Sequence, residues 1–394
     1  MSVEAAAYIP YGRQHISPAD KEAVLTILNS DWLTQGPAIE RFEQAVAEYC
    51  GAKYAVAVSS ATAALHIACL AAGVGVGDLV WTSPNTFVAS ANCALYCGAD
   101  VDFVDIDSKT YNMSLTALAE KLASVRNAKG RLPKAVIPVH FAGQSCPMED
   151  FKTLAAEYGF QLIEDASHAI GGGYAGLPVG NCRYADMAVF SFHPVKIITT
   201  GEGGMVLTNR EDLYQCLVRL RSHGITRDPA QMTTSPEGAW AYEQIELGFN
   251  YRLTDLQAAL GLSQMQRLDS FVARRHQLAS RYNALLADLP VIRPWQSPQT
   301  YSSLHLYPIQ LDTEKTKATR KHVFDVMRSK QIGVNVHYMP VHTQPYYRQR
   351  GFKPGDFPVA ERYYAHAISL PLFYDLTEDQ QDRVISVLKV SLAP

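Results

Sequence analysis

The chain has 394 residues, of which 47% are hydrophobic and 19% are charged, as expected of a globular protein with two or more domains. Its formal net charge of −3 argues against nucleic acid or an anionic membrane surface as a partner. The seven cysteines are scattered without a Cys-x-x-Cys pair, and the N-terminus lacks the pattern of a signal peptide, so we expect a cytoplasmic protein without a disulfide framework or a metal site.

Two helices are expected at the start of the chain. The first, at 18–28, has Ser17 as its N-cap and a proline at its first position. The second, at 38–49, ends at Gly51. Residues 31–37 form the loop between them.

Strands and helices alternate from residue 54 to residue 208. Strands are expected at 54–59, 79–82, 101–104, 135–140, 161–165, 187–192 and 205–208. The helices between them are expected at 63–72, from the late eighties to about 96, at 115–122 and at 149–158. This order is typical of the α/β class, with a mainly parallel sheet and helices on both faces.

The turn Ser60-Ala61-Thr62 leads from the first strand directly into a helix. The free backbone N–H groups at the start of that helix, the Thr62 hydroxyl and the helix dipole together predict an anion site. Ordinary helix caps have the same residue types, so this turn alone leaves both interpretations open.

A later buried strand carries Asp165 and His168 at its C-terminal end, where open α/β sheets bind ligands. Asp165 could pair there with a protonated pyridine nitrogen, or it could cap the turn. Phe87, which follows another strand, could stack on a flat ring or pack in the core. A metal site made of Glu164, Asp165, His168 and His193 is disfavoured, because the histidines lack close ligand spacing.

Lys196 follows the apolar run 187–192 and precedes a glycine-flanked acid, Glu202. Desolvation at the end of a buried strand disfavours the ammonium form, and a neutral amine can form a Schiff base. The lysine, the anion site and an acid for a ring nitrogen together predict pyridoxal phosphate as the cofactor. The alternative is an ordinary solvated lysine on a turn.

The rest of the chain has a different pattern. Residues 227–244 form a long polar excursion, and a long helix, straight or kinked, is expected at 256–289. The later elements are a strand at 305–311, a helix at 317–330, a strand at 333–338, a helix at 360–366, an extended segment at 368–371 and a helix at 377–392. We therefore expect a large cofactor-binding domain, 1–265, and a small α+β domain, 266–394.

Four separated motifs carry a resemblance to a known family. They are Ser60-Ala-Thr62, Asp165-Ala-Ser-His168, Ser191-Phe-His-Pro-Val-Lys196 with Gly201-Glu-Gly-Gly204, and Gly248-Phe-Asn-Tyr-Arg-Leu253. In this order they resemble the DegT/DnrJ/EryC1/StrS family of sugar aminotransferases, and the resemblance runs from about residue 11 to residue 388. It implies the type I fold of enzymes that use pyridoxal phosphate, with a mainly parallel seven-stranded sheet, and a homodimer whose active sites lie at the subunit interface.

The resemblance also implies roles for the matching residues. Lys196 would be the catalytic residue and would form the Schiff base, Asp165 would pair with the pyridine nitrogen, and Asn250 would reach the phosphate from the partner subunit. The expected cofactor-binding residues are Ala61, Thr62, Phe87, Asp165, His168, Ser191, Lys196 and Asn250.

Other segments are similar to one group within the family. These are Asn29–Gly36, Ile198–Gly204, Arg221–Ile225, His305–Pro308 and Val336–Pro340. The group aminates a UDP-linked 4-keto-6-deoxy-N-acetylhexosamine in pseudaminic acid biosynthesis, with L-glutamate as the donor and 2-oxoglutarate as its product. The residues expected to line the sugar pocket are Tyr11, Asp31, Trp32, Leu33, Thr34, Ala61, Ser191, Asn250, His337, Tyr338, Met339 and Pro340.

The sequence argues against three other functions and leaves a fourth open. A sugar dehydratase of the same fold would carry histidine in place of Lys196, and a cofactor-binding regulator would need a DNA-binding module that the sequence lacks. The motifs around the lysine and the aspartate differ from those of amino-acid aminotransferases. An aminotransferase for another nucleotide keto sugar, of the UDP-pentose or GDP-perosamine type, stays open because sugar specificity rests on a few contacts.

Overall fold

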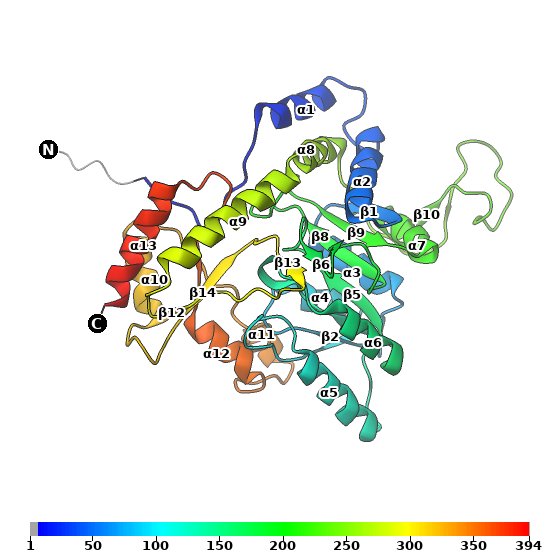
Figure 1. The fold of residues 1–394 in the computed structure, drawn as a ribbon. Coiled ribbons are helices and arrows are strands. Elements are labelled where there is room, and N and C mark those ends of the chain that lie inside the picture. The colour runs from blue at the N-terminus through cyan, green and yellow to red at the C-terminus, as the bar shows by residue number, and fades with distance from the viewer. Residues whose placement is uncertain (1–6, 394) are drawn as a thin grey trace.

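A seven-stranded sheet organises the first two thirds of the chain (Figure 1). The structure is a computed structural model, and it describes residues 7–393. In spatial order the strands are β1 (Tyr54–Val58), β9 (Gly204–Thr208), β8 (Met187–Ser191), β5 (Gln161–Asp165), β4 (Ala135–Ile137), β2 (Leu79–Thr82) and β3 (Asp100–Phe103). Only β9 runs antiparallel to its neighbours in this sheet, so the predicted mainly parallel seven-stranded sheet is confirmed.

Helices cover both faces of this sheet (Figure 1). Successive side chains of a strand point to opposite faces. Val56 and Val58 therefore lie in one core with α3 (Ala61–Ala71), whereas Ala55 and Ala57 lie in another with α2 (Pro37–Cys50). The other helices of this part are α1 (Pro18–Leu28), α4 (Ala89–Tyr96), α5 (Leu115–Asn127), α6 (Met148–Tyr158), α7 (Glu211–Arg221) and α8 (Asp255–Met265).

The long helix expected at 256–289, straight or kinked, is divided by a break. The chain forms α8 and then α9 (Leu268–Leu285), separated at Arg267, which has a non-helical φ of −117° and ψ of 6°. The Arg267 guanidinium turns toward α1, where it pairs with the buried Asp20 carboxylate at 2.5 Å. The apolar pattern continues across the break, because residues of both helices bury into the same core, and this continuity hides the break in the sequence.

A second, three-stranded sheet lies in the last third of the chain, in the order β12 (Val291–Ile292), β14 (Tyr307–Leu311), β15 (Ala367–Leu370). It shares one core with α9 and with two further helices, α10 (Arg320–Ser329) and α13 (Glu378–Leu392). The shorter helices α11 (Pro345–Arg348) and α12 (Pro358–His366) lie between these elements in sequence. The small α+β unit is thus present, and the domain boundary predicted at 265/266 falls between α8 and α9. The division into domains stays a prediction.

The strand predicted at 333–338 is wrong. Its residues make single bridges instead of a ladder. Ile332 pairs with Ile9 from the start of the described chain, and Asn335 pairs with Ser369. The Gly333 amide donates to the Ile9 carbonyl at 2.6 Å. The segment therefore pairs with two different segments and forms a continuous ladder with neither.

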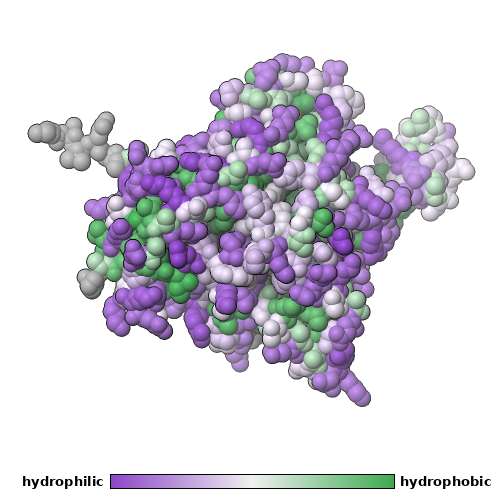
Figure 2. Space-filling view, in the orientation of Figure 1, coloured by the Kyte–Doolittle hydropathy of each residue, from purple (hydrophilic) through white to green (hydrophobic). Residues whose placement is uncertain are grey.

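Several short strands complete the fold. β6 (Gly173–Tyr174), β7 (Leu177–Pro178) and β13 (Thr300–Tyr301) form a small sheet. β10 (Ile225–Thr226) and β11 (Glu243–Gln244) pair at the base of the excursion, and residues 227–242 stand away from the body as a separate lobe (Figures 1 and 2). Within residues 7–393, no helix is both long enough and apolar enough to cross a membrane.

Candidate active site

A cavity of about 770 Å³ lies at the C-terminal ends of β5 and β8, beside the N-termini of α3 and α4. Open α/β sheets bind their ligands at this end of the strands. Ten predicted site residues line the cavity: Tyr11, Ala61, Thr62, Phe87, Asp165, His168, Ser191, Lys196, His337 and Tyr338. They come from six separated segments of the chain, which the fold brings together.

Lys196 enters the cavity from the turn that follows β8. Its backbone N–H donates to the carbonyl of His193 at 2.9 Å, which closes the turn and leaves the side chain half-buried in the cavity wall. Burial lowers the pKa of Lys196 to about 8, and the Asp165 carboxylate partly opposes this shift. A substantial fraction of the amine is therefore neutral and nucleophilic near physiological pH.

Asp165, the last residue of β5, is buried with its carboxylate held in place. The Ser90 hydroxyl donates to Oδ2 at 2.5 Å, and the Ser167 backbone N–H donates to Oδ1 at 3.1 Å. An acid at this position can accept a hydrogen bond from a ring nitrogen in the cavity.

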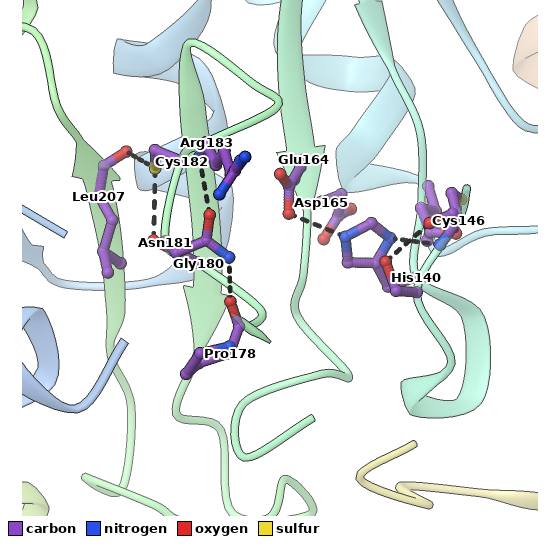
Figure 3. Close-up of polar contacts among 12 residues, drawn as sticks. His140, Cys146, Glu164, Asp165, Pro178, Gly180, Asn181, Cys182, Arg183 and Leu207 are labelled. Carbon is purple, nitrogen blue, oxygen red and sulfur yellow. Dashed lines mark hydrogen bonds and ion pairs between the residues drawn. The ribbon is translucent and has the colours of Figure 1, made fainter. Parts of the chain in front are cut away.

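Glu164, the residue before Asp165, faces the other side of the sheet (Figure 3). Its carboxylate lies 2.9 Å from Nε2 of His140, and the Cys146 amide donates to Nδ1 of the same ring, so Nε2–H is the donor to Glu164. Glu164 thus has no part in the cavity. Within residues 7–393, no group of three or more His, Cys, Asp or Glu side chains is arranged to hold a metal ion.

His168 is a neutral imidazole in a defined tautomer. Its Nδ1 accepts from the Ala142 amide at 3.3 Å, so the proton is on Nε2, which lies 3.1 Å from the Tyr338 hydroxyl. Burial, with the nearby Lys196, holds the pKa of His168 well below its usual range. Burial also holds the pKa of Tyr338 above its usual range, so this hydroxyl keeps a proton that it can donate into the cavity.

Asn335, His337 and Tyr11 form a second polar wall of the cavity. The Asn335 amide lies 3.3 Å from Nε2 of His337, and Nδ1 of His337 lies 2.8 Å from the Ser369 hydroxyl. Burial lowers the pKa of His337 to about 3, and it raises the pKa of Tyr11, whose ring is 5.6 Å from that of His337. This wall therefore offers neutral hydrogen-bonding groups, which suit the hydroxyls of an uncharged ring such as a sugar.

The predicted anion site lies at the start of α3. Ser60 caps the helix by accepting from the Ala63 amide at 3.1 Å, which leaves the Ala61 and Thr62 amides at the cavity. β9 approaches so closely that a side chain at Gly204 would place its Cβ 2.5 Å from the Ala61 nitrogen. Only glycine fits there, and the resulting cradle of amides and hydroxyls suits a phosphate.

Seven predicted site residues do not line this cavity. Asp31, Trp32, Leu33 and Thr34 form an exposed loop after α1, and Thr34 bridges to Thr254. Met339 and Pro340 follow the cavity residue Tyr338 along the chain but do not line the cavity. A seventh, Asn250, is exposed beside Ser222, its bridge partner.

The structure also brings in cavity residues that were not among the predicted site residues. Thr86, Ser90 and Asn335 lie outside the quoted motifs, whereas Glu202 and His305 lie within quoted segments but had no predicted role. The His305 ring packs against the His168 ring with centroids 4.4 Å apart. Ser90 and Thr86 lie four residues apart at the start of a helix, where serine and threonine are common as caps, so no local signal marks them.

Comparisons with known proteins identify the family of this chain. The model described as "DegT/DnrJ/EryC1/StrS aminotransferase family" matches residues 14–389. The chain belongs to this family. A sequence relative, the spore coat polysaccharide biosynthesis protein SpsC of Bacillus subtilis, is 39% identical over 97% of this chain and 96% of its own.

Solved structures extend the likeness to the whole fold of this family member. PseC of Helicobacter pylori, an aminotransferase involved in the biosynthesis of pseudoaminic acid, matches with a TM-score of 0.89 and 30% identity, covering 98% of this chain and 99% of PseC. The pyridoxal phosphate form of the sugar aminotransferase Spr1654 of Streptococcus pneumoniae matches with a TM-score of 0.87 and 27% identity, covering 98% of each chain.

The protein is a sugar aminotransferase that depends on pyridoxal phosphate. The cavity fits that cofactor on its own geometry. It has a half-buried amine of lowered pKa, a buried carboxylate held by two donors, and the Ala61 and Thr62 amides at a helix N-terminus, against which Gly204 packs closely. The predictions of fold, enzyme class and cofactor are therefore confirmed.

Proposed function

We propose that this aminotransferase moves the amino group of L-glutamate to the C4 keto carbon of UDP-2-acetamido-2,6-dideoxy-β-L-arabino-hex-4-ulose, in pseudaminic acid biosynthesis. The observation that carries the proposal is the set of neutral polar side chains, Tyr11, His337 and Tyr338, that line the same cavity as Lys196. An uncharged keto sugar would find hydrogen-bonding partners there without meeting a second charge. The likeness to PseC over nearly the whole chain supports the choice of sugar.

The residues of this chain would divide the work between binding and proton transfer. Pyridoxal phosphate, when bound, supplies an electron sink for the bond to the reacting carbon. Lys196 would hold the cofactor's aldehyde through its amine and, once displaced, would move a proton to or from the sugar C4. Asp165 would hold the ring nitrogen, His168 would lie beside the phenolic oxygen, and the Ala61 and Thr62 amides would hold the phosphate.

The enzyme would act as a homodimer with shared sites. Asn250 is exposed and lies outside this chain's own cavity, as a residue that serves the partner's site would. Close to it in sequence, Trp240 and Leu247 expose 74% and 79% of their surface. Such large apolar side chains favour burial against a second subunit. We extend the proposal to Asp31–Thr34, Met339 and Pro340, which would border the sugar in the assembled dimer.

A mixed dimer tests the shared site. Lys196→Ala and Asn250→Ala chains are each expected to be inactive alone, because every site lacks one of the two residues. A mixed dimer has one site with both residues intact, so it should regain part of the activity. If the mixture of co-expressed, separately tagged chains stayed inactive, the shared-site arrangement would be wrong.

A second candidate is an aminotransferase for another nucleotide 4-keto sugar, because SpsC, at 39% identity, is named for a different process, spore coat polysaccharide biosynthesis. The two candidate functions are distinguished by measuring kcat/KM for three substrates: the UDP-4-keto-N-acetylhexosamine, a UDP-4-keto pentose and a GDP-4-keto-6-deoxymannose. A site that hydrogen-bonds a substrate group rejects an analogue lacking it strongly, by about 10⁴-fold or more in favourable cases. We expect the highest kcat/KM for the N-acetylated sugar, and a higher kcat/KM for either of the other two sugars would contradict the proposal.

A further inference from the structure

Behind Asp165 lies a chain of buried hydroxyls that the motifs do not contain. Thr86 Oγ1 is 2.7 Å from Ser90 Oγ, and Ser90 Oγ is 2.5 Å from Oδ2 of Asp165. All three side chains are at most 4% exposed, although they border the cavity. Ser90 sits in the first turn of α4, and Thr86 precedes that helix.

The donor and the acceptor of each of these hydrogen bonds follow from the chemistry of the groups. An ionised carboxylate only accepts hydrogen bonds, so the Ser90 hydroxyl donates to Asp165. The Ser90 oxygen is then free to accept, and the Thr86 hydroxyl is the donor to it. The Phe87 carbonyl, at 3.4 Å from Ser90 Oγ, is a longer and uncharged alternative for the serine proton.

We propose that Ser90, supported by Thr86, is a positioning residue for the carboxylate of Asp165. The Ser167 amide binds Oδ1 and the Ser90 hydroxyl binds Oδ2, so the carboxylate plane is fixed by one donor on each oxygen. The remaining lone pairs are then presented to the cavity at one orientation. Thr86 orients the serine proton, because a serine oxygen that already accepts a hydrogen bond leaves its own hydroxyl proton fewer orientations.

The inference rests on the proposed role of Asp165 as partner of the cofactor's ring nitrogen. Loss of the Ser90 bond would let the carboxylate turn, and this would weaken its contact with that nitrogen. Hydrogen bonds to charged groups contribute enough that we expect an about tenfold higher Kd for pyridoxal phosphate in Ser90→Ala. Thr86→Val should raise the Kd less, because the Ser90 bond is kept.

The experiment measures the Kd for pyridoxal phosphate by titrating the apoenzyme, and the pH midpoint of the visible band of the loaded enzyme. The matched control is Thr82→Val, which loses a buried hydroxyl bond of 2.8 Å in the same sheet, to the Ile137 carbonyl. We expect both quantities to change in Ser90→Ala and Thr86→Val, and to stay at the wild-type value in Thr82→Val even where Tm falls equally. Equal changes in Ser90→Ala and Thr82→Val would overturn the proposal.

A double-mutant cycle separates this inference from the role of Asp165 itself. Asp165→Asn alone should raise the Kd, and Ser90→Ala should add little in that background, because the two residues act as one unit. If Asp165→Asn changed nothing, the proposed role of Asp165 would fail and the inference with it. If Asp165→Asn raised the Kd while Ser90→Ala and Thr86→Val did not, the positioning role alone would be refuted.

Discussion

The lowered pKa of Lys196 makes the loading of the cofactor depend on pH in a defined way. With a pKa of about 8 instead of the ordinary 10.5, the neutral fraction of the amine at pH 7 rises from about 0.03% to about 10%, or about 300-fold. The neutral amine is the form that attacks an aldehyde. The rate of loading should therefore rise about tenfold per pH unit below the pKa and level off above 8.

The pH at which the loading rate reaches half of its maximum is the midpoint of this dependence. The charge of Asp165 has a predictable effect on that midpoint. A negative charge near the amine favours the ammonium form, so Asp165→Asn should move the midpoint below that of the wild type. Glu202→Gln is the matched control, because this carboxylate also borders the cavity but its side chain is 60% exposed. Its removal should leave the midpoint unchanged.

The assay mixes apoenzyme with pyridoxal phosphate at a series of pH values on both sides of 8 and follows the visible absorbance. The same series with a free alkylamine corrects for titration of pyridoxal phosphate itself. Borohydride trapping and peptide mapping show that Lys196 carries the label. A midpoint near that of a free lysine, or a higher midpoint in Asp165→Asn, would refute the argument from burial and charge.

Two substitutions test the cradle and the packing of α1. Gly204→Ala would put Cβ 2.5 Å from the Ala61 nitrogen, so Tm should fall and the Kd for pyridoxal phosphate should rise; Gly75→Ala, with nothing within 4 Å, should change neither. Asp20→Asn should lower the free energy of unfolding, measured in urea at neutral pH, by about 3 kcal/mol. This is the lower limit of the cost of breaking a buried ion pair, because the Arg267 side chain is 26% exposed. Burial raises the pKa of Asp20, but its hydrogen bonds and Arg267 hold it below 3.8, so this stabilisation is present above that pH and is lost as pH falls through the lowered pKa. An undiminished difference in strong acid would contradict the assignment.

Local signals in the sequence predict much of the fold. Ser17 and the following proline locate α1 at 18–28, and the structure has the same bounds, since the capping box fixes the first turn. The end of β5 likewise brings Asp165 to the cavity, because parallel strands end at one edge of the sheet. These features depend on residues close together in sequence.

Contacts between distant segments could not be predicted in this way. Ser90 reaches Asp165 across 75 residues, and no residue pattern near either one reports it. The break at Arg267 depends on Asp20, which lies 247 residues away. Tyr11 and His337 were predicted only through the family resemblance, since their meeting requires the start of the chain to lie against the segment at 332–333.

The most direct test of the proposed reaction is the absorbance spectrum of the loaded enzyme during one cycle of turnover. We expect a visible band that bleaches when L-glutamate is added and returns when the UDP-4-keto-6-deoxy-N-acetylhexosamine follows, with neither change in Lys196→Ala. A band that bleaches with glutamate and does not return with this sugar would contradict the proposed acceptor. The absence of any band after pyridoxal phosphate is added would contradict the role of Lys196.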